Sequence, residues 1–141
     1  MECTVEWGGP SGMLFTATTG SGHVAVMDGA VDGGGHDLAP RPMEMVLLGT
    51  GGCTAYDVVL ILKRGRHAVT GCSVKLEADR AETDPKVFTR IHFTFTVTGR
   101  KLPREAVERA VSLSHEKYCS ASAMFAKTAE LSFAVEVVEA P

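Results

Sequence analysis

The first 40 residues of this 141-residue chain contain no lysine and no arginine. The charges there are all acidic, on Glu2, Glu6, Asp28, Asp32 and Asp37, and the whole chain has a formal net charge of −3. Binding of DNA or RNA requires a basic surface that attracts phosphate groups. The sequence therefore predicts no nucleic-acid partner, and solubility is the favoured explanation of the acidic excess.

A secretory signal and a long apolar run are also missing. A signal peptide has a basic segment followed by an apolar one, and neither opens this chain. The longest mostly apolar stretch, residues 45–62, is interrupted by Gly49, Thr50, Gly51, Gly52 and Asp57. This stretch predicts a buried helix rather than a membrane span. We therefore expect a cytoplasmic protein with no membrane partner.

Several motifs that identify common sites do not occur. The four cysteines form no C-x-x-C pair and no H-x₃-H is present, so the paired ligands of a structural zinc site are missing. The motifs G-x-S-x-G and H-E-x-x-H are also absent, so no motif indicates a serine hydrolase or a zinc protease. The glycine-rich residues 28–40 lack the lysine pattern of a phosphate-binding loop. In a reducing cytoplasm the cysteines are expected to be catalytic, metal-binding or buried rather than disulfide-bonded.

What is present predicts one α+β domain over residues 1–141. Period-two alternation predicts strands and apolar stripes predict helices. The expected elements are strands at 4–7, 13–18 and 23–27, a helix at 42–63, a hairpin with strands at 72–79 and 91–98, helices at 103–119 and 121–129, and a strand at 131–137. This order favours an antiparallel sheet backed by helices. The helix at 42–63 is apolar nearly all round, which is typical of the interior or of an interface.

Cys53 lies in the middle of the predicted central helix. Gly49, Gly51 and Gly52 precede it closely, and three glycines destabilise a helix by about 2–3 kcal/mol relative to alanine. Glycine allows another backbone to approach, or leaves space beside a reactive side chain. The simpler alternative is that Cys53 is a small buried hydrophobic residue, which is the commoner role of a single helical cysteine.

Cys119 follows His115, Lys117 and Tyr118 at a predicted helix junction. A neighbouring cation or histidine can lower the pKa of a thiol and favour the reactive thiolate. His115 and Cys119 are four residues apart, a spacing that also suits two metal ligands on one helix face. The other cysteines, Cys3 and Cys72, and the other histidines, His23, His36, His67 and His92, suit core, edge or surface positions.

The residues around the two central cysteines form longer motifs. They are Pro42-Met43-Glu44, Gly51-Gly52-Cys53-Thr54-Ala55-Tyr56-Asp57-Val58-Val59, Val97-Thr98-Gly99-Arg100 and Glu116-Lys117-Tyr118-Cys119-Ser120. These motifs resemble the OsmC/Ohr family of bacterial thiol proteins, and within it the YhfA-like branch. The resemblance spans nearly the whole chain, and the two cysteine motifs are specific in combination.

The resemblance implies an intertwined homodimer in which sheets from both chains wrap two central helices, with an active site at the interface. It also implies reduction of organic or inorganic hydroperoxides, with Cys53 as the peroxidatic nucleophile and Cys119 as the resolving thiol, in defence against oxidative stress. No cofactor or metal is required, because a thiolate is oxidised to a sulfenic acid and a second thiol condenses with it to a disulfide. An external dithiol, lipoyl-linked in the organic-hydroperoxide members, then restores the thiols.

The sequence departs from the family pattern beside the nucleophile. The peroxidase members have an activating arginine in their N-terminal strands, whereas residues 1–40 here have none. Their glutamate partner matches Met43, and Glu44 is one position, about 100° of helix, further on. Arg41 or Lys117 are the candidates for the missing cation, with Glu44 in support. The departure also favours an alternative function, a non-enzymatic redox sensor or ligand-binding protein with a pocket at the dimer interface.

Overall fold

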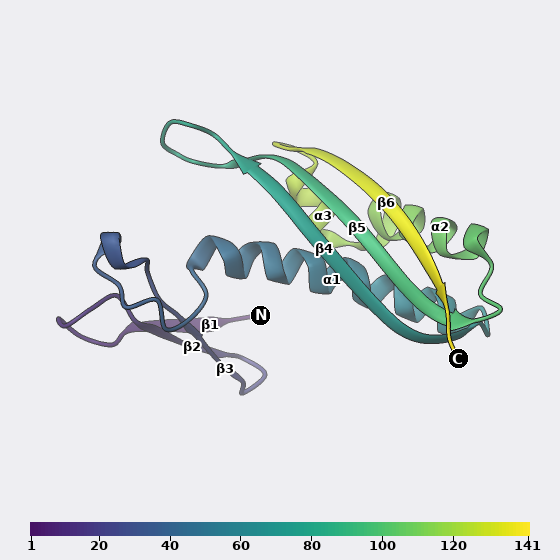
Figure 1. Ribbon diagram of the computed structural model, residues 1–141. Coiled ribbons are helices and arrows are strands. Elements are labelled where there is room, and N and C mark those ends of the chain that lie inside the picture. Colours follow the sequence, from purple (N-terminus) through teal and green to yellow (C-terminus); the bar gives the residue numbers. More distant parts are fainter. The chain divides into compact units, whose positions relative to one another are not determined.

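The computed structural model describes every residue from Met1 to Pro141. By its internal contacts the chain comprises two compact units, Met1–Leu48 and Gly49–Pro141. Figure 1 labels the principal helices and strands of both units. The long helix α1 (Pro42–Arg64) begins in the first unit and continues in the second. The assignment of both units to one domain stays a prediction.

The first unit contains a small antiparallel sheet in the order β1-β2-β3. Its strands are β1 (Cys3–Trp7), β2 (Phe15–Thr19) and β3 (Val24–Met27), which confirms the three short strands predicted there. Gly22 has a φ of +84° in the turn between β2 and β3, a conformation that favours glycine. Every residue of β1 is exposed, including the side chains of Val5 and Trp7. This sheet therefore has apolar side chains that the first unit does not cover.

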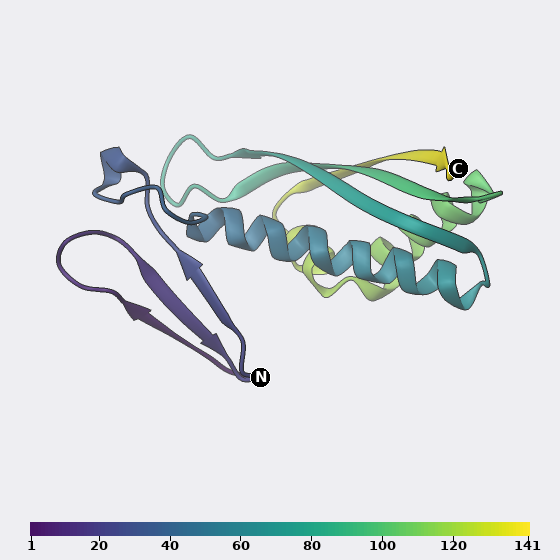
Figure 2. The same ribbon diagram turned by 60° about the horizontal axis from the view of Figure 1, so that its bottom comes forward.

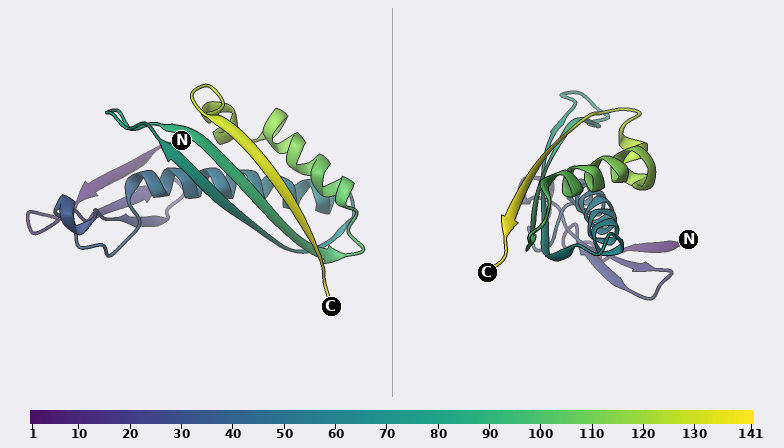
Figure 3. Two further views of the ribbon diagram at one scale, coloured as in Figure 1. Left: turned by 45° about the horizontal axis from the view of Figure 1, so that its top comes forward. Right: turned by 90° about the vertical axis from the view of Figure 1, so that its right-hand side faces the viewer.

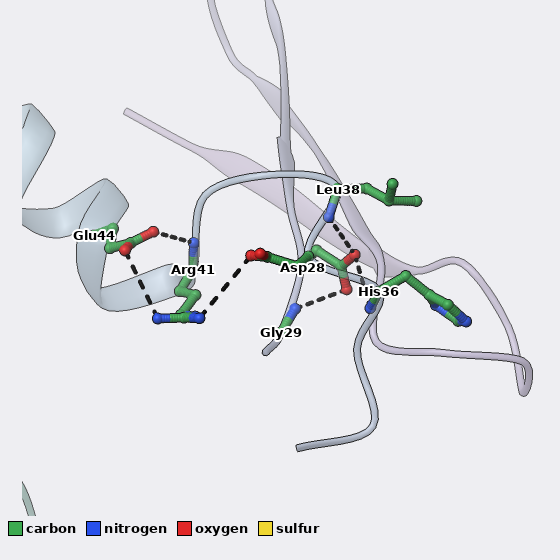
Figure 4. Close-up of polar contacts among 7 residues, drawn as sticks. Asp28, Gly29, His36, Leu38, Arg41 and Glu44 are labelled. Carbon is green, nitrogen blue, oxygen red and sulfur yellow. Dashed lines mark hydrogen bonds and ion pairs between the residues drawn. The ribbon is translucent and has the colours of Figure 1, made fainter. Parts of the chain in front are cut away.

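Asp28 organises the glycine-rich loop that follows β3. Its side chain is almost fully buried and accepts hydrogen bonds from the backbone N–H groups of Gly29 (2.7 Å), His36 (3.3 Å) and Leu38 (3.1 Å) (Figure 4). These bonds, chiefly those from Leu38 and Gly29, lower the pKa of Asp28. The loop, which includes the 3₁₀ turn η1 (Val31–Gly33), is thus held together by hydrogen bonds to one buried carboxylate.

The second unit contains the main sheet, in the order β4-β5-β6. β4 (Ala68–Arg80) and β5 (Phe88–Arg100) are antiparallel, which confirms the predicted hairpin. β6 (Glu130–Glu139) pairs with β5 in parallel, so the expectation of a wholly antiparallel sheet was wrong in this pairing. The intervening helices return the chain to the end of the sheet where β5 begins, and such a crossover produces parallel neighbours.

The helices of the second unit cover one face of this sheet (Figures 2 and 3). The inward-facing residues of β5, Ile91, Phe93, Phe95 and Val97, are fully buried. Residues of the helices are fully buried as well or nearly so, among them Val58, Leu62, Val107 and Ala110. Burial of each large apolar side chain stabilises the fold by roughly 1.5–3 kcal/mol. The opposite face carries the polar members of the same alternating pattern, such as Lys75 and Glu77.

Helix α1 is only partly covered by its own chain. The predicted helix at 42–63 is confirmed at Pro42–Arg64, but its buried residues are Thr50, Gly51, Thr54, Val58 and Leu62. Val46, Leu48 and Tyr56 are 44%, 60% and 70% exposed. By length and composition alone α1 could cross a membrane, a test that the core helix of a globular protein also passes. The expectation of a buried helix therefore holds for one face of α1 only.

The helix predicted over residues 103–119 is interrupted. It consists of α2 (Arg104–Leu113) followed by a π-helical turn, η2 (Ser114–Tyr118). Cys119 has extended backbone angles and ends the turn, and α3 (Ser120–Phe125) starts directly after it. The last helix is thus shorter than the predicted 121–129. This interruption places Cys119 at a corner of the chain.

Candidate functional site

The structure brings Cys53 and Cys119 together in the second unit. Cys53 extends from the middle of α1, and Cys119 lies at the junction of η2 and α3. The two cysteines are neighbours, close enough for Cys53 to raise the pKa of Cys119, and both are free thiols. Cys53 is half-buried, whereas Cys119 is only 2% exposed. A small reagent that enters from solvent therefore reaches Cys53 more easily than Cys119.

The π-helical turn determines where Cys119 lies. The N–H of Cys119 donates to the carbonyl of Ser114 across 2.7 Å, a bond that spans five residues instead of four. Cys119 is also the N-cap of α3, since the N–H of Ser122 donates to its Sγ across 3.4 Å. Single π-helical turns occur frequently at functional sites. The turn rotates Cys119 out of the helical pattern that its sequence spacing suggests.

Burial raises the pKa of Cys119 above its usual range. The hydrogen bonds from Ser122 act in the opposite direction, and the neighbouring Cys53 raises the pKa of Cys119 further. Cys119 therefore keeps its proton near neutral pH. The expectation that neighbouring charges lower the pKa of Cys119 was wrong, because Lys117 lies over the ring of Tyr118, 5.5 Å from its centroid, and burial dominates.

His115 is an uncharged part of the site near neutral pH. Its ring packs against Phe133 and Phe93, with centroid distances of 3.5 and 5.3 Å. This burial lowers the pKa of His115 to about 4. Nδ1 is 2.9 Å from Oγ of Ser122, while Nε2 is buried without a hydrogen-bond partner. No group of three or more His, Cys, Asp or Glu side chains is positioned to hold a metal ion.

A buried chain of polar side chains joins η2 to α1 beside Cys53. Oγ of Ser114 donates to Oδ2 of Asp57 across 3.0 Å and accepts a hydrogen bond from Oγ1 of Thr54 across 2.9 Å. Ser114 and Thr54 are fully buried. Thr54 and Asp57 are three residues apart and share a face of α1. Sequence reasoning missed this contact, although hydroxyl and carboxyl groups within an apolar helix were a signal for it.

The glycines before Cys53 do not all have the same role. A Cβ on Gly51 would lie 2.6 Å from Cδ1 of Leu76, so this glycine allows α1 to pack close to β4. Gly52 has open space around it. It lines an apolar cavity of about 470 Å³ together with Ala55, Tyr56, Val59, Leu60, Lys63 and Cys72. Burial raises the pKa of Cys72, which does not suit a nucleophile.

Arg41 and Glu44, the predicted supporting residues, form a small network at the start of α1 (Figure 4). The backbone N–H of Arg41 donates to Oε2 of Glu44 across 2.9 Å, and their side chains are 4.0 Å apart. Arg41 also lies 4.0 Å from Asp37. A glutamate that returns to the N–H before a helix stabilises the helix start. The structure thus gives both residues a structural role, and their action on the thiols stays a prediction.

Comparisons with known proteins show what this chain is similar to in sequence. The sequence model of the family described as OsmC-like protein matches residues 34–134. Protein YhfA of Escherichia coli K12 is 47% identical over 140 residues, which are 99% of this chain and 100% of YhfA.

Solved structures extend the likeness to the fold. A hypothetical protein from Aquifex aeolicus VF5 is 29% identical with a TM-score of 0.84, over 99% of this chain and 97% of that one. The organic hydroperoxide resistance protein OhrB of Bacillus subtilis shares the fold, with a TM-score of 0.62 and 17% identity over 96% of this chain and 98% of OhrB.

Proposed function

Because the chain belongs to the OsmC-like protein family, we propose that it is a thiol-dependent hydroperoxide reductase that acts through Cys53 and Cys119. The observation that carries this proposal is that the two free thiols are neighbours, near enough for Cys53 to raise the pKa of Cys119. Two neighbouring thiols of this kind are suited to forming a disulfide. The presence of organic hydroperoxide resistance proteins among chains of the same fold supports the substrate class.

The first step is oxidation of Cys53. Its thiolate attacks the outer oxygen of the hydroperoxide, the O–O bond breaks, and the alkoxide leaves and takes up a proton as an alcohol. Cys53 becomes a sulfenic acid. The partial exposure of Cys53, against the 2% exposure of Cys119, supports Cys53 as the thiol that meets the peroxide.

The second step is resolution by Cys119. Its sulfur attacks the sulfur of the sulfenic acid, the S–O bond breaks, and hydroxide leaves as water with the proton from Cys119. The resulting disulfide is returned to two thiols by an external dithiol, which becomes a disulfide itself. A lipoyl-linked dithiol is the reductant that we propose, in a cytoplasmic pathway of oxidative-stress defence.

We further propose that the active protein is a homodimer. The apolar side chains of Val5, Trp7, Leu48 and Tyr56 are all at least half exposed. A second copy of the chain would bury such side chains.

A non-enzymatic redox sensor or ligand-binding protein is the second candidate. Two observations favour it: residues 1–40 have no arginine, and Arg41 is engaged with Asp37 and Glu44. The cavity lined by Tyr56, Lys63 and Cys72 is apolar with one cation. This candidate predicts a single oxidation by peroxide without sustained turnover.

The deciding experiment titrates the reduced protein with cumene hydroperoxide and hydrogen peroxide. Free thiols are counted, and the Cys53–Cys119 disulfide is mapped by mass spectrometry, with Cys72→Ser as the matched control. Rapid stoichiometric disulfide formation, followed by multiple turnover with dihydrolipoamide, thioredoxin or glutathione, supports the reductase. Oxidation that stops after one equivalent supports the sensor, and thiols that remain reduced in excess peroxide contradict both redox roles.

A further inference from the structure

His115 has no task in the two chemical steps proposed above, yet its surroundings are highly specific. The ring is fixed between aromatic side chains, with Phe133 at 3.5 Å and Phe93 at 5.3 Å between centroids. One ring nitrogen, Nδ1, has a single partner, the hydroxyl of Ser122 at 2.9 Å. The other, Nε2, is buried and has none.

Ser122 connects this imidazole to the resolving thiol. It is 1% exposed, its N–H donates to Sγ of Cys119, and its hydroxyl lies near enough to Cys119 to lower the pKa of that thiol. A hydroxyl has only one proton to donate. When that proton is directed at the sulfur, the oxygen must accept its other hydrogen bond from Nδ1–H of His115.

The unpartnered nitrogen of His115 agrees with this assignment. If Nδ1 carries the proton of the neutral ring, Nε2 is a bare acceptor. A buried acceptor without a partner is tolerated more often than a buried N–H without one. The opposite tautomer would leave an N–H buried among Phe93, Phe95 and Phe133 with nothing to receive it.

We propose that His115 is a positioning residue for the resolving thiol: its Nδ1–H holds the Ser122 hydroxyl so that the hydroxyl donates to the sulfur of Cys119. The inference rests on the proposed reductase cycle, in which Cys119 attacks the sulfenic acid of Cys53. Hydrogen bonds to an ionised sulfur are stronger than those to a neutral thiol. The Ser122 hydroxyl therefore stabilises the negative charge that develops on Cys119 as the disulfide forms.

Few other groups influence Cys119. Cys53 faces it from α1, and its charge opposes ionisation of Cys119. Asp57 of α1 is bound to Ser114, and Lys117 lies over Tyr118. The contribution of the His115–Ser122 pair can therefore be measured separately once Cys53 is replaced.

The test measures the pH midpoint at which Cys119 reacts with methyl methanethiosulfonate in a Cys53→Ser background, resolved by peptide mass spectrometry. His115→Phe keeps an aromatic ring but removes Nδ1–H, Ser122→Ala removes the hydroxyl, and His115→Asn restores an N–H near the position of Nδ1. We expect the midpoint to rise by about one pH unit, about tenfold less thiolate, in the first two variants. The His115→Asn variant and the exposed control Ser120→Ala are expected to match the background.

An unchanged midpoint in His115→Phe or in Ser122→Ala overturns the proposal. Equal rises in His115→Phe and His115→Asn also overturn it, because they would assign the effect to packing. Should His115→Phe fail to fold, the contrast between Ser122→Ala and Ser120→Ala still decides. The reaction uses no peroxide, so it is informative even where the wild-type protein proves inactive as a reductase. In an active protein, His115→Phe is expected to slow disulfide formation but not the oxidation of Cys53.

Discussion

Ser114 Oγ donates a hydrogen bond to Oδ2 of Asp57 across 3.0 Å and thereby joins the π-helical turn η2 to the helix that carries Cys53. The carbonyl of the same serine accepts the N–H of Cys119 across 2.7 Å. One residue thus connects the elements of both thiols. The relative position of Cys53 and Cys119 depends on this connection as well as on the apolar core.

Replacement of Ser114 is therefore expected to affect both stability and disulfide formation. In Ser114→Ala, Thr54 and Asp57 lose their buried partner, and an unsatisfied buried polar group costs about 1–3 kcal/mol. We expect a loss of this size in the free energy of unfolding, measured with urea, and slower Cys53–Cys119 disulfide formation. The exposed neighbour Ser112 provides the control, and equal stabilities of Ser112→Ala and Ser114→Ala would contradict the structural role of Ser114.

Asp28 predicts a specific dependence of stability on pH. Its backbone hydrogen bonds lower its pKa in the folded protein, so its stabilising contribution is present above the pKa of about 3.9 of an unfolded chain. The contribution is lost as the pH falls through the folded value. Asp28→Asn should therefore be less stable than wild type at pH 7, with a difference that shrinks toward pH 3. Thermal unfolding of both proteins checks this, and Asp32→Asn, at an exposed site, should show no such trend.

Gly51 is expected to depend on its neighbour across the helix–sheet interface. An added Cβ would lie 2.6 Å from Cδ1 of Leu76, and such overpacking typically costs 1–3 kcal/mol. In the opposite direction, alanine stabilises a helix by about 1 kcal/mol relative to glycine. We expect Gly51→Ala to destabilise the wild-type protein but to be neutral or stabilising in a Leu76→Ala background. A double-mutant cycle measures this coupling, and additive effects would show that the close approach is unimportant.

The alternating patterns predicted the strands well, because alternation reflects burial of one face. Phe93 and Phe95 are fully buried, as their spacing indicates. The parallel pairing of β6 and the π-helical turn were not predictable in this way. Both depend on contacts between residues distant in sequence, such as that of Ser114 with Thr54 and Asp57.

The pairing of Cys53 with Cys119 was predicted from the resemblance of their motifs, not from the spacing of the residues. Sequence reasoning treated His115 as a possible activator or metal ligand of Cys119. Its ring instead packs against Phe93 and Phe133. These residues belong to strands β5 and β6, and the sequences of the strands do not indicate which helix residue packs against them. The sequence predicted no role for Ser122, because a serine on a short helix has no distinctive sequence pattern.

The exposed face of α1 predicts the oligomeric state. Tyr56 is 70% exposed on an apolar helix, and a charge placed in a dimer interface without a partner is strongly unfavourable. We expect the wild-type protein to sediment as a dimer and Tyr56→Glu to dissociate at concentrations at least tenfold higher than wild type does. Lys75→Glu, on the polar face of the main sheet, is the control. A wild-type monomer at micromolar concentration would contradict the dimer.

The two cysteines predict opposite outcomes when each is replaced in the presence of peroxide. In Cys53→Ser, the more exposed thiol of the pair is missing and no sulfenic acid forms at position 53. We therefore expect turnover with an external dithiol to fall to background. In Cys119→Ser, Cys53 still reacts but no resolving thiol is present, so the sulfenic acid persists and is oxidised further to the sulfinic acid. Mass spectrometry of the peptide that contains Cys53 should then show a gain of two oxygen atoms. The fraction of peptide with this gain should increase with each addition of peroxide, together with a progressive loss of activity.

Cys72→Ser, which changes a thiol outside the pair, is expected to behave as wild type. Sustained turnover in Cys53→Ser would assign the reaction to a different thiol, and stable activity of Cys119→Ser would mean that the external dithiol reduces the sulfenic acid directly.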